Sequence, residues 1–169
     1  MLARLVLTIM TDFTINQVEA GAEVSQLDSL LWDVLWKPID LPRNVRDSFA
    51  LNGEYLELVA RSDGALVGGL VANWTSPTEV EIRHIAVRPE NQKQGVGARL
   101  VTSLLQHLSA RHCRRLHAIA RNTSAGFFRK LGFSTAPGKP PEHPLFKKHG
   151  ITFELLEKIV EPTDSLDKK

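Results

Sequence analysis

The stretch EIRHIAVRPENQKQGVGARLVTSLLQHL, residues 81–108, decides the fold of this chain. A run with strand character ends at Val87, a proline and a glutamine-rich loop follow, and Gly95 and Gly97 then open a helix. After the glycines, apolar residues recur every three or four positions, which predicts a helix with one apolar face. The stretch therefore indicates a strand, a turn and a helix, the unit of an α/β protein.

The sequence on either side supplies further alternating elements. Strands are predicted for residues 13–18, 55–61, 65–74, 79–87, 114–120 and 151–158, and helices for 24–37 and 42–51. The turn SDG between the second and third of these strands is a strong hairpin signal. Residues 124–133, SAGFFRKLGF, read as a short helix that runs into another strand. The fold class predicted from this order is α/β (α+β) with a mixed sheet.

Length and composition bound the organisation of the chain. With 169 residues, 43% hydrophobic and 24% charged, the sequence is typical of one soluble globular domain. We assign residues 13–160 to that domain, residues 1–12 to an N-terminal extension and residues 161–169 to a disordered tail. No internal repeat and no linker divides the chain.

Charge, cysteine usage and hydropathy exclude several classes of protein. The net charge of +2 argues against a dedicated nucleic-acid binder, and the short basic run at 111–115 is typical of a solvated helix end. A lone cysteine, Cys113, excludes an internal disulfide and fits a reducing compartment. The apolar run 5–10 is shorter than a secretory core, and no segment reaches the length of a membrane span. We therefore expect a cytoplasmic location and no membrane.

The two glycines indicate an anion site. The first turn of a helix exposes backbone N–H groups at the positive end of the helix dipole, and glycine lets a phosphate approach them closely. Residues 94–98 therefore read as a phosphate cradle, although a tight turn with glycines used for packing is the alternative. A dinucleotide fingerprint is excluded because Leu100 stands where its third glycine would be, and no P-loop run occurs.

Two motifs together resemble the GNAT superfamily of N-acetyltransferases. AVRPENQKQGVGARLV, residues 86–101, is similar to the acetyl-coenzyme A signature Gln/Arg-x-x-Gly-x-Gly/Ala, which Gln92, Gly95 and Gly97 fill. SAGFFRKLGF is similar to the family element Ala-x-x-Phe-Tyr-x-Lys-x-Gly-Phe. The resemblance spans roughly residues 13–158. It implies a mostly antiparallel, twisted sheet of about seven strands with about four helices, splayed between the fourth and fifth strands.

The resemblance also implies which residues bind the coenzyme, with the acyl-pantetheine lying in the gap between the splayed strands. Ile85 and Ala86 would line the pantetheine, and the backbone N–H of Val87 would face the thioester oxygen. Asn122 would hydrogen-bond the coenzyme, and Phe128 would pack beside the pantetheine end. The phosphates would lie on the loop and first helical turn, formed by Gln92, Lys93, Gln94, Gly95, Val96, Gly97 and Ala98.

Two positions depart from the family pattern. Ser124 replaces the usual alanine, which is a small change. Phe128 stands where many members have a tyrosine that can protonate the departing thiolate, and a phenyl ring has no proton to give. The departure leaves open how the thiolate is neutralised.

Glu81 is the favoured general base, because it stands six residues before Val87, an offset that resembles the catalytic glutamate of histone acetyltransferases in the superfamily. Glu79 lies on the same strand face and is the second choice. The other interpretation of Glu81, a solvated carboxylate paired with Arg83, stays equally open. Four histidines are weaker candidates, with structural roles favoured for the first two: His84, His117, His143 and His149.

The resemblance implies an acyltransferase that moves the acetyl group of acetyl-CoA to a primary amine by direct attack in a ternary complex. The expected partners are acetyl-CoA, as cosubstrate, and an amine acceptor, with no metal and no nucleic acid; assembly as a homodimer stays open. A non-catalytic acyl-CoA-binding or regulatory module is the alternative. Small amines, aminoglycosides, amino acids, polyamines and protein N-termini all remain open as acceptors.

Overall fold

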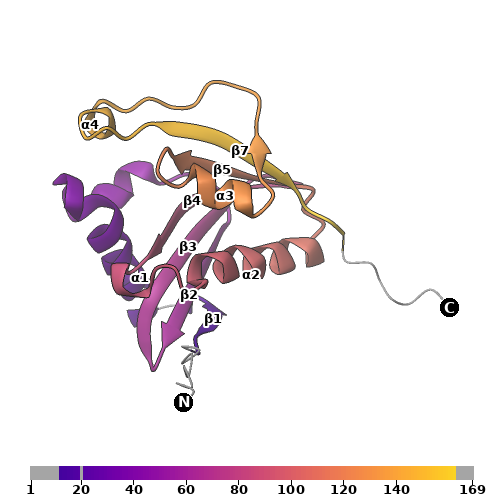
Figure 1. Cartoon of the computed structure of the whole chain (residues 1–169). Coiled ribbons are helices and arrows are strands. Elements are labelled where there is room, and N and C mark those ends of the chain that lie inside the picture. Colours follow the sequence, from indigo (N-terminus) through magenta and orange to yellow (C-terminus); the bar gives the residue numbers. More distant parts are fainter. Residues whose placement is uncertain (1–11, 20, 163–169) are drawn as a thin grey trace, which may run out of the picture.

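A twisted sheet of seven strands forms the centre of the computed structural model, which describes residues 12–19 and 21–162 (Figure 1). The strands lie in the order β1-β2-β3-β4-β5-β7-β6. Neighbours pair antiparallel except β4 and β5, which pair in parallel. The strands are β1 (Thr14–Gln17), β2 (Tyr55–Ser62), β3 (Ala65–Ser76), β4 (Glu79–Val87), β5 (Arg115–Arg121), β6 (Ser134–Thr135) and β7 (Phe153–Ile159).

The predicted hairpin joins β2 to β3 through a two-residue turn. Asp63 has φ 49° and Gly64 has φ 78°. Two consecutive residues with positive φ are required by a type I′ turn, whose twist matches that of the flanking strands. This is why an Asp-Gly pair stands at the turn.

Four α-helices accompany the sheet: α1 (Ala22–Leu31), α2 (Val96–Ala110), α3 (Ala125–Lys130) and α4 (Pro144–Lys147). The predicted helix over 24–37 is more irregular than expected, because α1 passes into a π-helical turn (Trp32–Trp36) and a 3₁₀ turn (Lys37–Ile39). The predicted helix over 42–51 is only a 3₁₀ turn, Val45–Phe49. A further 3₁₀ turn, Pro89–Asn91, precedes α2.

Helices α1 and α2 cover opposite faces of the sheet (Figure 1). The apolar stripe of α2, including Leu100, Leu104 and Leu108, is fully buried in one core cluster. On the other face, Leu27 and Leu31 of α1 pack with Val59 in a second cluster. Burying each such side chain contributes roughly 1.5–3 kcal/mol, so these two faces hold the helices to the sheet.

The sheet opens between β4 and β5. Their parallel pairing covers only residues 79–82 of β4 and 115–118 of β5. At the same place, the register with β3 shifts between Val71 and Ala72, which leaves Arg83 as the extra residue of a β-bulge. The strands diverge beyond this point, so the predicted seven-stranded sheet, splayed between its fourth and fifth strands, is confirmed.

The predicted N-terminal extension and C-terminal tail lie, apart from residues 12, 161 and 162, outside the described residues. Within the part of the chain that the structure describes, no helix combines the length and the apolar character needed to cross a membrane.

Candidate active site

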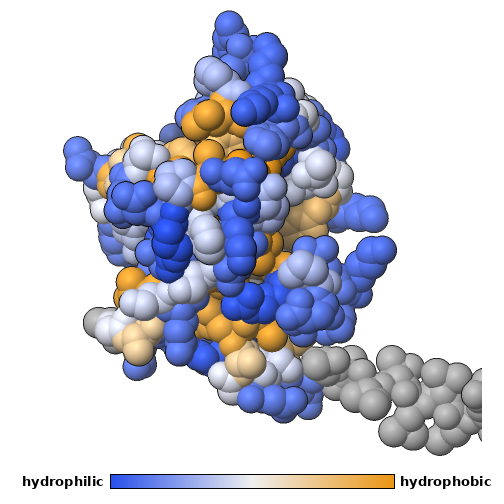
Figure 2. All heavy atoms as spheres, turned by 90° about the vertical axis from the view of Figure 1, so that its left-hand side faces the viewer, coloured by the Kyte–Doolittle hydropathy of each residue, from blue (hydrophilic) through white to orange (hydrophobic). Residues whose placement is uncertain are grey.

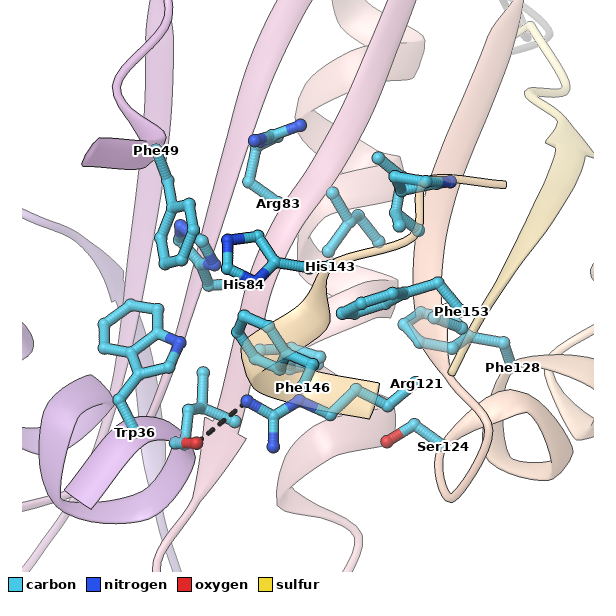
Figure 3. Close-up of a pocket in the computed structure, with 16 residues that line it drawn as sticks. Trp36, Phe49, Arg83, His84, Arg121, Ser124, Phe128, His143, Phe146 and Phe153 are labelled. Atoms are coloured by element: carbon cyan, nitrogen blue, oxygen red, sulfur yellow. Dashed lines mark hydrogen bonds between the residues drawn. The ribbon is translucent and has the colours of Figure 1, made fainter. Parts of the chain in front are cut away.

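A cavity of about 290 Å³ lies where β4 and β5 separate. Residues 82–85 of β4 and 119–121 of β5 form part of its wall. In the close-up, Trp36 and Phe49 lie at one side of the cavity, and Ser124 and Phe128 lie at the other (Figure 3). The cavity therefore connects the gap in the sheet with the face on which α1 packs.

Aromatic rings from four distant segments line this cavity. The ring centroids of Trp36 and Phe49 are 5.8 Å apart, those of Phe49 and Phe146 are 6.2 Å apart, and those of Phe146 and Phe153 are 5.4 Å apart. These separations are usual for tilted and edge-on aromatic contacts. Figure 2 shows apolar side chains between hydrophilic ones on this side of the molecule. The aromatic wall makes the cavity suited to apolar groups.

Two arginines also line the cavity (Figure 3). Arg121 donates from Nη2 to the carbonyl oxygen of Leu35 at 2.8 Å, and its guanidinium lies 5.4 Å from the ring centroid of Phe146. Burial lowers the pKa of Arg121. Arg83 donates from Nη1 to Glu81 at 3.0 Å, and its buried Nε has no hydrogen-bond partner among the described residues. Positive charge is thus held against apolar surface.

His84 stands beside these arginines, with its ring 5.0 Å from that of Trp36 in an edge-on contact. Burial lowers the pKa of His84 to about 3, and the positive charges of Arg46, Arg83 and Arg121 contribute. The imidazole is therefore neutral at neutral pH. It lines the cavity as an uncharged polar group and gives no titration between pH 5 and 8.

The loop before α2 presents a row of backbone donors. None of the backbone N–H groups of residues 94–98 donates to another described residue, and no side chain caps the helix. Gly95, the N-cap, has φ 83°, a left-handed conformation that a side chain would strain. Unpaired N–H groups at the start of a 15-residue helix are typical of an anion site.

Gly97 allows the ring of Phe127 to pack closely against α2. A Cβ built on it would lie 3.2 Å from Cζ of Phe127, so the ring of α3 rests directly on the helix backbone. The tight-turn interpretation of the glycines therefore has a structural basis, since Gly95 shapes the loop and Gly97 permits close packing. The phosphate cradle stays a prediction.

The free edge of β4 leads from the cavity to the cradle. Arg88 donates its backbone N–H to Val67 of β3 at 2.9 Å. Because antiparallel pairs alternate between bonded and non-bonded residues, the N–H groups of Ile85 and Val87 point away from β3, into the gap. The carbonyl of Val87 accepts a hydrogen bond of 3.1 Å from Nε2 of Gln92, which ties the loop to the strand end.

The cavity is lined by some of the residues predicted for the site and not by others. Of the residues expected to bind the coenzyme, Ile85 and Phe128 line it, whereas Ala86 is buried in the core cluster on the α1 face. Glu81 does not line the cavity; its side chain is 18% exposed and reaches the site only through the ion pair with Arg83. Phe128 packs edge-on between Phe127 and Phe133, at 5.1 and 5.2 Å.

The remaining predicted residues have protein partners of their own. Oε1 of Glu79 accepts a hydrogen bond of 3.2 Å from Nε2 of His117, and Nη1 of Arg115 lies 4.0 Å from the same oxygen. Asn122 donates from Nδ2 to the carbonyl of Gly150 and accepts the N–H of Thr152, both at 3.2 Å, so it holds the start of β7. Its contact with a coenzyme stays a prediction. Among the described residues, no cluster of three histidine, cysteine or acidic side chains has metal-site geometry.

Sequence reasoning missed several lining residues, chiefly Phe49, Arg121, Phe146 and Phe153. His143 lines the cavity as part of the segment before α4, whereas His149 is exposed. The short helix α4 was not predicted, and it is this helix that carries Phe146 onto the sheet. The strand alternation of Ile119 and Arg121 was the one local signal that both side chains share a face.

The chain belongs to the acetyltransferase (GNAT) family, whose model matches residues 22–133. It is 26% identical, over 117 residues, to the uncharacterized N-acetyltransferase YjhQ of Escherichia coli, a match that covers 63% of each chain. The chain spans less than two thirds of the length of the curated relatives it matches.

Two solved structures share the fold. A putative N-acetyltransferase from Lactobacillus plantarum has a TM-score of 0.74 and 14% identity, covering 88% of this chain and 99% of its own. An aminoglycoside 6′-N-acetyltransferase complexed with coenzyme A has a TM-score of 0.68 and 16% identity, covering 88% and 98%. At these identities the likeness concerns the fold alone.

Proposed function

We propose that this protein is an N-acetyltransferase that transfers the acetyl group of acetyl-CoA to a primary amine bound in the same complex. The observation that carries the proposal is the continuity of unpaired backbone donors. They run along the free edge of β4 to the start of α2, beside an aromatic cavity. A thioester coenzyme has the matching order of groups: phosphates, an amide-rich arm and a small acyl end.

The residues present fit this coenzyme. The N–H groups of residues 94–98 would hold the phosphates, with Lys93 exposed beside them. The backbone N–H groups of Ile85 and Val87 would hydrogen-bond the amides of the pantetheine arm, as they would a neighbouring strand. Ser124 and Phe128 would border the acyl end of the arm. When bound, acetyl-CoA supplies a carbonyl at which a C–N bond to the amine forms as the C–S bond breaks.

The chain's own residues would assist at two atoms. The N–H of Val87 would donate to the carbonyl oxygen, where negative charge develops. Glu81 would take the amine proton through water, because its carboxylate is bonded to Arg83 and stands outside the cavity. The aromatic walls would keep bulk water from the thioester.

Phe128 supports a second candidate, a non-catalytic acyl-CoA-binding module. The ring is only 2% exposed and lies among other phenylalanines, so no acid stands at that position to protonate the thiolate. A thiol pKa near ~8.5 makes the thiolate a tolerable leaving group, which favours the enzyme.

Two measurements test the proposal: calorimetry of acetyl-CoA binding, and CoA release in the presence of a panel of primary amines. We expect binding and amine-dependent CoA release. Binding without release to any amine would favour the non-catalytic module, and absence of both would refute the coenzyme assignment.

A further inference from the structure

The cavity contains guanidinium donors that the protein does not use. Arg121 has one described hydrogen-bond acceptor, the carbonyl of Leu35, and no described carboxylate lies within 4.0 Å of it. The Nε of Arg83 is buried and has no partner among residues 12–19 and 21–162. Both residues line the cavity (Figure 3), but protein atoms cover the Nε of Arg83, so Arg121 is the group that a ligand in the cavity would meet. Buried donors of this kind require an acceptor, and a charged donor favours an anion.

The nearby carboxylates leave the charge of Arg121 uncompensated. Arg46 pairs with both Asp28 and Glu57, and Glu81 pairs with Arg83. Among the described residues, no carboxylate lines the cavity itself. The positive surroundings also contribute to the lowered pKa of His84. A ligand that brings only positive charge would therefore be repelled, whereas one that brings a carboxylate would be attracted.

We infer that the acceptor is a primary amine that also carries a carboxylate and a small apolar body, such as an apolar α-amino acid. This inference rests on the proposed acetyltransferase function. The carboxylate would bind Arg121, and the apolar body would lie among Trp36, Phe49 and Phe146. The cavity volume of about 290 Å³ stands at the lower end of the usual range for small-molecule sites, ~300–1,000 Å³. Polyamines and aminoglycosides are disfavoured by charge, and aminoglycosides also by size.

The same charges would prepare the amine for transfer. A positive environment disfavours the ammonium form, so it increases the fraction of neutral amine that can attack. Nitrogen would bond to the carbonyl carbon as sulfur leaves, and the amine would lose one proton to solvent or to a water-linked base. The Arg121 side chain would thus bind and orient the acceptor without taking part in proton transfer.

Matched acceptors test this inference in the full-length protein. Phenylalanine would be compared with phenethylamine and phenylalaninamide, and leucine with 3-methylbutylamine, at saturating acetyl-CoA. We expect kcat/KM for the carboxylate-bearing member to exceed that of its partners by at least ~100-fold, because the site's charged donors would be unpaired without it. Spermidine should be the poorest acceptor.

Arginine variants identify the groups responsible. Arg121→Gln should raise the KM for the amino acid and reduce its advantage over the decarboxylated amine. Arg114→Gln is the matched control, because Arg114 is exposed and lies outside the cavity. Should a cavity variant fail to fold, calorimetry on the parent with CoA compares N-acetylphenylalanine with N-acetylphenethylamine, and the carboxylate should tighten binding.

Equal or better acetylation of the amines that lack a carboxylate would overturn the acceptor class and leave the acetyltransferase proposal intact. If no amine is acetylated, the calorimetric comparison still decides: equal or absent binding of the two acetylated compounds overturns the inference. Failure of acetyl-CoA itself to bind would instead count against the proposed function.

Discussion

The ring of Phe127 rests on Gly97, where a Cβ would lie 3.2 Å from its Cζ. The contact joins α3 to the first turn of α2, at the proposed phosphate cradle. It means that a substitution at Gly97 has two consequences, one for packing and one for anion binding, and these need separate measurements.

Gly97→Ala should lower the free energy of unfolding by ~1–3 kcal/mol, because the ring must shift to admit a methyl group. Gly97→Ala should also reduce acetyl-CoA affinity. Adding Phe127→Leu should restore part of the lost stability but not the affinity. Denaturant titration and calorimetry on the single and double variants provide both quantities. Recovery of affinity together with stability would show that Gly97 serves packing alone. Gly126→Ala, where a Cβ has open space, is the control.

Glu81→Gln should reduce turnover at neutral pH by ~10²–10⁴ and leave acetyl-CoA affinity unchanged. Glutamine keeps a hydrogen-bond acceptor for Arg83, so the change removes the base rather than the contact. Glu79→Gln, on the same face but paired with His117, should be nearly neutral for turnover. Equal rates for the parent and Glu81→Gln across the pH–rate profile would transfer the role to water or to the acceptor itself.

Phe128→Tyr should bind acetyl-CoA as the parent does and turn over equally fast or modestly faster. Phe128 borders the cavity, so we expect the hydroxyl of the tyrosine to extend into that space. Phe133→Tyr is a matched control from the same aromatic cluster that does not line the cavity, and an unpaired hydroxyl there should cost ~1–3 kcal/mol without changing the rate. If the parent binds acetyl-CoA but acetylates no amine, and Phe128→Tyr is active, the protein is the non-catalytic binding module and not an enzyme.

The free energy of unfolding should decrease as the pH is lowered below 6.5, because of His84. The pKa of His84 is about 3 in the folded chain against 6.5 for an ordinary histidine, so below pH 6.5 the unfolded chain takes up a proton that the folded chain does not. The contribution of neutral His84 to the free energy of unfolding is complete above pH 6.5 and is lost as the pH falls toward 3. The free energy of unfolding changes by at most ~1.36 kcal/mol per pH unit in this range.

Denaturant titrations between pH 7 and 4 check this expectation. His84→Phe keeps a ring against Trp36 and should show a flatter dependence on pH than the parent. His149→Gln, at an exposed position, should follow the parent. Parallel curves for the parent and His84→Phe would mean that His84 is protonated in the folded chain.

Local sequence was sufficient for most of the fold and for the loop and helix start that we propose bind the coenzyme. The Asp63–Gly64 turn, the alternation of β4 and the apolar stripe of α2 are each specified within a few residues, since turn geometry and burial periodicity act at short range. The run 92–98 and the SAGFFRKLGF motif likewise carry their own signal, because the backbone conformation they require depends on glycines within the motif. Their proposed contacts with acetyl-CoA stay predictions.

Only the tertiary structure decided the aromatic cavity. Trp36, Phe49, Arg121 and Phe146 are carried by different elements. They meet because the turns at Trp32–Trp36 and Val45–Phe49, the segment around α4 and the splayed strands converge on one cavity. The ion pair of Glu81 with Arg83 and the neutral state of His84 likewise follow from the β-bulge and from burial, which depend on neighbours brought together by packing. Sequence by itself determined the class of the protein, through local patterns. The charge and shape of the cavity arise from contacts between distant segments, which no local pattern encodes.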